Sequence, residues 1–298
     1  MSLVITFVAV ALGAGIWLAI LRYYDRIEPE SVRDLLMVGI VGGLVSVLMA
    51  AGLNEVARWQ LGLGLDLFDP QPSTSLLRLA LFCLFVGLVE EALKAMATVY
   101  SARYMGDLDE PVDAMIYAMT VGLGFAAFEN VLYARQFGND VLLARFLWPV
   151  PAHMAYSALW GYGLALARFV YPNRNRAVVM ARWVVLAGVI HALANYLLFL
   201  RTPVAAWTSL TILAVLAFVA HHMIRRLVAE SPFLEPGECP ECRRFNPPNA
   251  PNCLSCGEPL TDTEIFGTCP CGLKRIPQAA DDCPVCGIPV ESVVSGES

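Results

Sequence analysis

Ionisable and hydrogen-bonding side chains interrupt four stretches of the sequence that are otherwise apolar. They are Glu90, Glu91, Lys94, Glu129, His153, Ser157, His191 and Asn195. Three pairs are four residues apart, a spacing that places both members on one face of a helix: Glu90 with Lys94, His153 with Ser157, and His191 with Asn195. An ionisable group in the middle of a membrane span costs roughly 2.5–3.5 kcal/mol, so such groups are candidates for function. The sequence therefore predicts a polar pocket inside a bundle of apolar helices.

The side chains expected in this pocket suit the hydrolysis of a substrate. A carboxylate can take a proton from water, and imidazole and amide groups can stabilise an oxyanion. Glu129, His153 and His191 also match the two-histidine, one-glutamate ligand set of a catalytic zinc. Carboxylates and histidines serve equally as proton relays in carriers or as structural ion networks. The residues by themselves leave a hydrolase and a proton-coupled carrier about equally supported.

The elements that would position these residues are apolar runs long enough to cross a bilayer. Only 15% of the 298 residues are charged, against about a quarter in soluble domains. Seven runs are of suitable length, at about 3–21, 35–53, 76–100, 112–134, 143–169, 179–200 and 204–224. The predicted fold class is an all-α polytopic membrane protein with about seven transmembrane helices, followed by two small zinc-ribbon modules.

Prolines refine these boundaries. Pro111 suits the first turn of a helix, where a missing N–H does no harm. Pro149 and Pro151 should kink the fifth span or delay its start. The segment 54–75 contains two aspartates and two prolines, and we expect a loop there, with room for a short surface helix.

Lysine and arginine asymmetry across short loops predicts the orientation. With the N-terminus outside, the inner segments hold ten arginines and the outer segments five. The inner ones are Arg22, Arg26, Arg33, Arg103, Arg168, Arg174, Arg176, Arg182, Arg225 and Arg226; the outer ones are Arg58, Arg78, Arg135, Arg145 and Arg201. We therefore expect an integral membrane protein with its N-terminus outside and its C-terminal tail in the cytoplasm.

Eight of the nine cysteines fall in this tail: Cys239, Cys242, Cys253, Cys256, Cys269, Cys271, Cys283 and Cys286. In a reducing compartment such pairs are metal ligands more often than disulfides. Two thiolate knuckles separated by a short hairpin place four sulfurs around one Zn²⁺, and rubredoxin-like iron is the alternative. Glycines 257, 272 and 287 each follow a second cysteine, where a positive φ is favoured. The Cys269–Cys271 pair is one residue shorter than a usual knuckle.

The chain is thus predicted to contain a transmembrane domain (1–228), a linker (229–237), zinc ribbon 1 (238–260) and zinc ribbon 2 (266–290). The acidic, proline-rich linker favours a mobile tail. The ribbons are expected to recruit a cytosolic protein or to gate substrate, and a stability cap is the alternative. Their few basic residues are mixed with acids, which argues against binding to nucleic acid.

The order of the polar motifs resembles the PrsW family of bacterial intramembrane proteases. The matching segments are Asp25-Arg-Ile-Glu28-Pro29-Glu30, Glu90-Glu91-x-x-Lys94, Glu110-Pro-Val-Asp113 to Tyr117, Gly122 to Tyr133 with Glu129-Asn130, His153, and His191-Ala-Leu-Ala-Asn195. The resemblance covers roughly residues 1–224, and the zinc ribbons look like an appended module. It implies a bacterial cell membrane location and cleavage of membrane-associated substrates, which in the family include membrane-bound anti-sigma factors.

The same motifs are distantly similar to those of the CAAX prenyl endopeptidases, EExxxR, FxxxH and HxxxN. By that resemblance Glu90 is the general base, and His191 and Asn195 stabilise the tetrahedral intermediate. Two departures are Lys94, one position early, and Glu129, which replaces the FxxxH histidine; Glu129 would orient water, bind a metal or position His153. We expect water activation by Glu90 without a metal, and the alternative is a non-catalytic receptor or scaffold that acts through its ribbons.

Overall fold

The computed structural model describes residues 3–62, 75–105, 108–170, 175–231, 233–234, 238–246, 252–258 and 260. Within these ranges the chain is almost entirely helical, and the β-structure consists of an isolated bridge between Glu238 and Phe245. Zinc ribbon 2, with Cys269, Cys271, Cys283 and Cys286, lies outside the described residues.

The helices follow one another with short connections. In chain order they are α1 (Leu3–Tyr24), α2 (Val32–Gln60), α3 (Leu76–Met105), α4 (Pro111–Phe137), the 3₁₀ turn η1 (Asn139–Val141), α5 (Leu142–Leu147), α6 (Pro149–Ala165), the π-helical turn η2 (Leu166–Val170), α7 (Arg176–Phe199) and α8 (Pro203–Ala229). Five of them, α1, α2, α4, α7 and α8, are long and apolar enough to cross a membrane. This confirms a mostly helical integral membrane protein, as the sequence predicts.

The fifth predicted span, 143–169, is not a single helix. It is divided between α5 and α6 at Trp148, whose φ of −123° and ψ of −69° are non-helical. Pro149 occupies the first turn of α6, and a residue that precedes proline is disfavoured in the helical conformation. Of the two predicted effects of Pro149 and Pro151, the backbone shows an interruption within the span and not a delayed start, since α5 already begins at Leu142.

The loop expected over 54–75 begins later than predicted. Helix α2 continues to Gln60 and includes Asn54 and Arg58, whose guanidinium pairs with Glu55 one turn earlier. The helix can continue because the polar groups of this turn satisfy one another and Asn54 faces the protein interior. Residues 63–74, with the aspartates and prolines, are not described.

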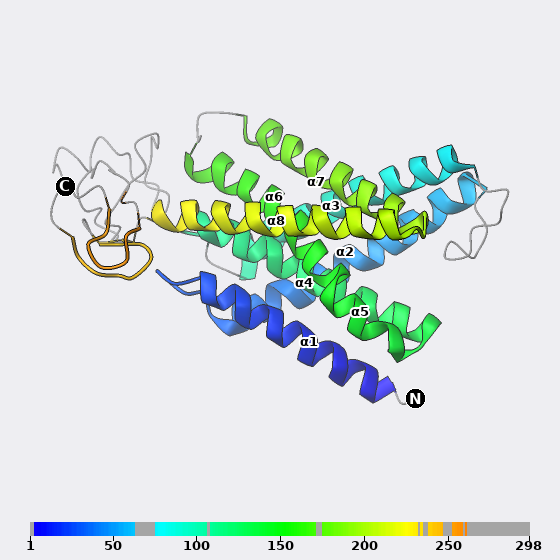
Figure 1. Cartoon of the computed structure of the whole chain (residues 1–298), viewed down its shortest axis with the longest axis horizontal. Helices are drawn as coiled ribbons and strands as arrows, with labels where there is room; N and C mark the ends of the chain where they lie inside the picture. The colour runs from blue at the N-terminus through cyan, green and yellow to red at the C-terminus, as the bar shows by residue number, and fades with distance from the viewer. Residues whose placement is uncertain are drawn as a thin grey trace.

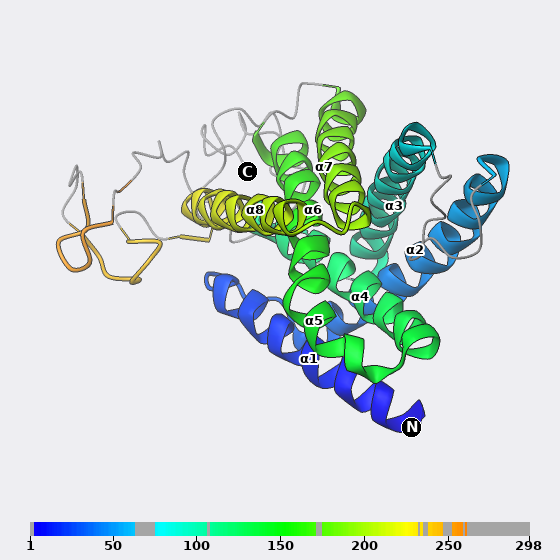
Figure 2. The same ribbon diagram turned by 45° about the vertical axis from the view of Figure 1, so that its right-hand side comes forward.

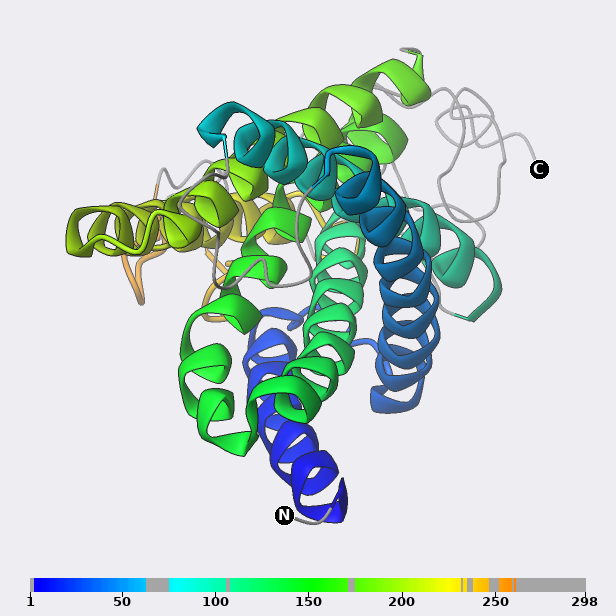
Figure 3. The same ribbon diagram turned by 90° about the vertical axis from the view of Figure 1, so that its right-hand side faces the viewer.

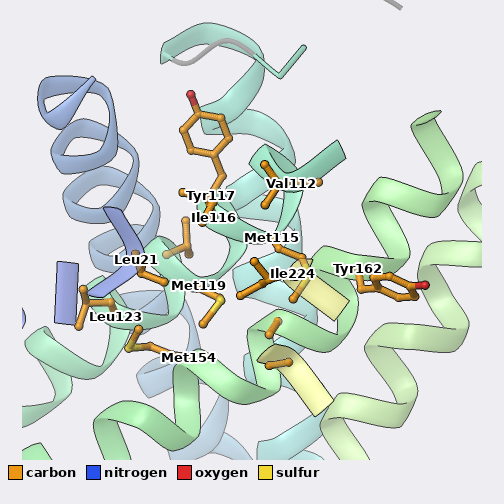
Figure 4. Packing of buried hydrophobic residues seen from close by; sticks show 14 of the residues in the cluster. Leu21, Val112, Met115, Ile116, Tyr117, Met119, Leu123, Met154, Tyr162 and Ile224 are labelled. Carbon is orange, nitrogen blue, oxygen red and sulfur yellow. The ribbon is translucent and has the colours of Figure 1, made fainter. Parts of the chain in front are cut away.

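Helix α4 runs through the middle of the bundle. It packs against α2 and α6 most extensively, and also against α1, α3 and α8. Figure 1 and Figure 2 show α8 and α1 on the outside, and Figure 3 shows α4 between α2 and the α5–α6 segment. In Figure 4, Met115 and Met119 of α4 lie among Leu21, Met154 and Ile224. This apolar contact holds α4 in place at the centre.

Paired glycines bring the polar helices together. A Cβ atom on Gly87 of α3 would lie 2.3 Å from the carbonyl oxygen of Gly188 in α7. Small residues at such crossings allow membrane helices to approach closely. Because Gly87 precedes Glu90 by three residues and Gly188 precedes His191 by three, this crossing sets the two polar faces against each other.

Candidate active site

A cavity of about 320 Å³ lies between α2, α3, α4, α6 and α7. Its walls include Glu90, Glu129, His153, His191 and Asn195, together with apolar side chains. It extends to Leu198, Phe199 and Arg201 beyond the C-terminal half of α7, as well as to Arg145 and Trp148. The cavity therefore lies toward the end of the bundle where α2, α4 and α7 finish, away from the C-terminal end of α8. The predicted convergence of the polar faces is what the structure contains.

Glu90 and Glu129 both line this cavity, and Glu90 is the member of the Glu90–Glu91 pair that does so. Its Oε1 atom accepts a hydrogen bond of 3.0 Å from Nδ2 of Asn54. Its Oε2 atom is buried and accepts no hydrogen bond from the described residues; Nζ of Lys94 and Nε2 of His191 are each 3.9 Å away. A buried carboxylate oxygen with no donor is costly unless it meets water or another ligand. Glu90 thus lines the cavity and keeps one oxygen without a hydrogen-bond donor from the described residues.

Glu91 has both oxygens occupied and lies outside the cavity wall. Its side chain is fully buried, and Oε1 accepts from Nζ of Lys94 at 2.8 Å and from Nδ1 of His191 at 2.9 Å. Its Oε2 atom accepts from Nε1 of Trp160 at 3.0 Å. Lys94 is therefore closer to Glu91 than to Glu90, the partner that the spacing of four residues predicts. Glu91 can position other groups, and its lone pairs are not available to a substrate.

Lys94 and Glu129 hold His153 from opposite sides. Nδ1 of His153 is 2.9 Å from Nζ of Lys94, and Nε2 is 3.2 Å from Oε2 of Glu129. A lysine ammonium can only donate a hydrogen bond. Nδ1 of His153 therefore accepts from Lys94, and the N–H group at Nε2 donates to Glu129. Arg145 also donates to Glu129 and, at 2.6 Å, to Oδ1 of Asn130. The result is a continuous chain of charge-assisted hydrogen bonds along one wall.

His191 is fixed by Glu91 and by an aromatic ring. Because Nδ1 donates to Glu91, Nε2 is turned toward Glu90. The ring of Tyr156 stacks on the imidazole, with centroids 4.6 Å apart and planes 18° apart. Asn195, one turn later on α7, lines the same cavity. A carboxylate that accepts from one ring nitrogen is typical of histidines whose other ring nitrogen contacts a metal or substrate.

The sequence-predicted residues do not all meet here. Glu90, Glu91, Lys94, Glu129, His153, His191 and Asn195 form one cluster, whereas Ser157 does not. The Ser157 hydroxyl lies against α4, 2.7 Å from the position of a Cβ on Gly122, where it contributes to packing.

Three residues that form hydrogen bonds with the polar cluster were not predicted from the sequence. Asn54 was assigned to a loop, Arg145 was counted as an outer-loop charge, and Trp160 was not singled out. A polar residue at the end of an apolar run was a usable signal for Asn54. No comparable sequence signal exists for Arg145, because only the packing of α5 against α4 brings this residue to Glu129.

Part of the cluster has the donor set of a catalytic metal site. One ligand atom each from Glu90, His153 and His191 lies within 4.8 Å of the others, so the carboxylate is Glu90 and not Glu129 as the sequence suggested. Two imidazoles and a glutamate suit zinc, and the donor-free oxygen of Glu90 fits such a role. Both nitrogens of His153 already have partners, so this residue would have to exchange Lys94 or Glu129 for the ion.

Comparison with known proteins identifies the relatives of this chain. The family model of the PrsW family intramembrane metalloproteases matches residues 30–222. The chain belongs to the PrsW family. Protease PrsW of Geobacillus kaustophilus (strain HTA426) is 34% identical over 31% of this chain and 41% of its own length. Protease PrsW of Bacillus subtilis (strain 168) is 32% identical over 41% and 54%. That of Clostridioides difficile (strain 630) is 23% identical over 61% and 74%.

The chain spans about half the length of the PrsW relatives that it matches with the highest identity among those compared. No solved structure matches it. The PrsW match includes every residue of the cavity cluster and ends before the cysteine-rich tail. The tail therefore stands outside the part of the chain that is related to the family.

The first cysteine module is a second candidate metal centre. The Sγ atoms of Cys239, Cys242, Cys253 and Cys256 lie within 4.8 Å of one another. Two Sγ–Sγ distances are 3.6 Å, from Cys239 to Cys256, and 3.5 Å, from Cys242 to Cys253. Four thiolates about 2.3 Å from one ion in a tetrahedron are about 3.8 Å apart. The four sulfurs therefore fit a single tetrahedral metal ion.

The two knuckles of this module have the same backbone geometry. The N–H groups of Arg243 and Gly257 each donate 2.9 Å bonds to the carbonyl of the first cysteine of their knuckle. Both residues have positive φ, 60° and 78°. The sequence pointed to this conformation only at Gly257, because arginine is rarely placed there.

Proposed function

We propose that this chain is an intramembrane endopeptidase in which Glu90 activates the attacking water. The observation that carries the proposal is that Glu90 lines the cavity while its buried Oε2 atom has no hydrogen-bond donor among the described residues. Water placed there would lose a proton to Glu90 as its oxygen attacks the scissile carbonyl carbon. The proton would then pass to the nitrogen of the leaving amine, which completes hydrolysis of the peptide bond.

The remaining cluster residues serve this step by position and charge. Asn195 supplies a hydrogen-bond donor to the oxyanion of the tetrahedral intermediate, and His191 does so through Nε2 when both ring nitrogens carry protons, because its Nδ1 proton is held by Glu91. Glu91 and Lys94 hold His191 and His153 in place, as their 2.8–2.9 Å contacts support. Of the three roles considered for Glu129, positioning His153 has the best support, because Glu129 contacts both His153 and Arg145.

A metal ion would give Glu90 a different role, that of a ligand in place of the general base. Held by Glu90, His153 and His191, a zinc ion would polarise the substrate carbonyl and lower the pKa of bound water. The roles of Glu91 and Asn54 in holding His191 and Glu90 would be unchanged, whereas His153 would give up its contact with either Lys94 or Glu129.

The proposed topology has seven spans, with α3 and the α5–α6 segment added to the five apolar helices. The N-terminus is outside, which is supported by the excess of arginine in the segments predicted to face inward. Ribbon 1 adjoins the C-terminal end of α8 (Figure 1), so the ribbons would be cytoplasmic and hold Zn²⁺. The cavity would then lie in the outer half of the bacterial cell membrane. We propose substrates anchored in that membrane, with regulators of the anti-sigma-factor kind as candidates.

The alternative is a non-catalytic receptor or scaffold that recruits cytosolic partners. It draws support from the seating of ribbon 1 on the bundle, where Arg26 pairs with Glu241 at 3.1 Å and Arg225 pairs with Glu258. Such contacts could transmit a signal from the cavity to the tail without any cleavage.

Comparison of new protein termini in host membranes separates the two functions. Membranes with wild type or Glu90→Gln at equal levels should differ by fragments that end in or near a transmembrane segment. Identical terminus profiles under envelope stress, with both proteins folded, would favour the receptor.

A further inference from the structure

A second group of buried carboxylates lies at the opposite end of the bundle. Asp25 follows α1, Glu110 is the N-cap of α4, and Asp113 is in the first turn of α4. One oxygen from each residue lies within 4.8 Å of the other two. The residues are 2%, 0% and 0% exposed. None of them contacts the cavity of the candidate active site.

Each carboxylate uses one oxygen in the fold and leaves the other without a donor. Oδ2 of Asp25 accepts from the N–H of Glu30 at 2.7 Å, and Oδ2 of Asp113 accepts from that of Glu110 at 2.7 Å. Oε2 of Glu110 accepts from the hydroxyl of Ser231. Asp25 Oδ1, Glu110 Oε1 and Asp113 Oδ1 are buried and accept no hydrogen bond from the described residues. Each of the three neighbouring side chains therefore has one buried oxygen that the described residues leave without a donor.

Two of the arginines that the structure describes lie near this group. Arg22 is 3.8 Å from Asp25, although its guanidinium is also engaged by the carbonyl oxygen of Glu30. Arg168 of η2 interacts electrostatically with Asp113 and Asp109. Further acids face the group: Glu28, Glu30 and Asp109. Among the described residues the carboxyl groups near this site thus outnumber the guanidinium groups, and burial of anions in excess of cations is strongly unfavourable.

We propose that Asp25, Glu110 and Asp113 form a binding site for a hard divalent cation of the Ca²⁺ or Mg²⁺ class. The donors are all carboxylate oxygens, which such ions prefer, whereas zinc and copper favour imidazole or thiolate. A bound ion would link the α1–α2 connection to the start of α4. Through Ser231 it would also reach the segment that leads to ribbon 1.

The test is titration of the full-length, zinc-loaded chain in detergent with CaCl₂ and, separately, MgCl₂, followed by calorimetry and thermal unfolding. We expect one ion per chain, with a dissociation constant at or below about 1 mM for at least one of the two, and a higher melting temperature. Asp25→Asn and Asp113→Asn should each weaken binding at least tenfold. The matched control is Asp140→Asn, an exposed carboxylate at the other end of the bundle, which should bind as wild type does.

Other outcomes would overturn the proposal. Absence of saturable binding of either ion would mean that the carboxyl groups share protons instead. Equal affinity in wild type and Asp25→Asn would exclude these ligands. Binding lost in Glu90→Gln but kept in Asp113→Asn would assign the ion to the cavity. Retention of zinc by ribbon 1 and a monodisperse elution profile verify that each variant is folded.

Discussion

The Oε1 atom of Glu91 lies 2.9 Å from Nδ1 of His191, so the residue next to the proposed base positions the imidazole that faces that base. Two adjacent glutamates on one helix point to different neighbours because successive side chains on a helix are about 100° apart. Glu90 meets the cavity, and Glu91 meets α6 and α7 through Trp160 and His191. The double-glutamate motif therefore combines a carboxylate that lines the cavity, the proposed base, with one that positions His191.

Substitution of each glutamate should separate these roles. Glu91→Gln should lower the rate of substrate cleavage roughly 10–100-fold, as loss of an outer-shell partner does. It should also lower stability by roughly 3–5 kcal/mol, because Lys94 loses its closest buried partner. Glu90→Gln should abolish cleavage and leave the melting temperature unchanged or raised. Thermal unfolding and fragment formation measure the two effects, and a stable Glu91→Gln protein with wild-type activity would contradict this division.

The close crossing of α3 and α7 predicts an unusual response to alanine. Gly87→Ala should reduce stability by roughly 1–3 kcal/mol and lower cleavage, since its Cβ would lie 2.3 Å from the carbonyl oxygen of Gly188. The control is Gly52→Ala, where a Cβ meets nothing within 4 Å. That change should be neutral or stabilise by up to about 1 kcal/mol through helix propensity. Equal melting temperatures for the two variants would refute the role of the crossing.

The four sulfurs of ribbon 1 predict a defined loss of metal. Cys253→Ser in the full-length chain should reduce the zinc content by one ion per chain, measured by elemental analysis after gel filtration. Cys83→Ser, which changes the buried cysteine of α3, should leave the zinc content unchanged. An unaltered zinc content in Cys253→Ser would show that this cluster does not hold the ion.

Carboxyl groups at the ribbon end of the bundle predict a pH dependence of stability. Burial raises the pKa of Asp25 to about 6, of Glu30 to about 7 and of Glu110 to about 8. A folded protein whose carboxyl pKa is raised holds more protons than the unfolded chain, so stability falls as pH rises from about 4 to 8. Without added divalent cations, the melting temperature should therefore decrease from pH 5 to pH 8.

Two substitutions test whether these buried acids cause the pH dependence. Glu30→Gln should flatten the decrease, whereas the exposed Asp140→Asn should not alter it. Zinc binding to thiolates strengthens as pH rises, so the ribbons would act in the opposite direction. A melting temperature that rises over this range would contradict the assignment of raised pKa values.

Much of the fold follows from apolar run length and proline position, and the polar residues of the cavity follow from their presence in those runs. Pro149 correctly marked the start of α6. The pairing of Lys94 with Glu91 and of His191 with Glu91 could not be derived, because both depend on the rotation of α3 against α6 and α7. The spacing of four residues within one helix predicted Glu90 as the partner of Lys94. Arg145 was missed because only tertiary packing brings α5 to Glu129.

The most direct test of the central claim uses purified full-length chain in lipid vesicles with a membrane substrate identified by its new terminus. Wild type and Glu55→Gln, which alters an exposed glutamate one residue from Asn54, should release the same fragment at similar rates. Glu90→Gln should release none while it retains the wild-type melting temperature. Cleavage by folded Glu90→Gln at the wild-type rate would show that Glu90 does not activate the water.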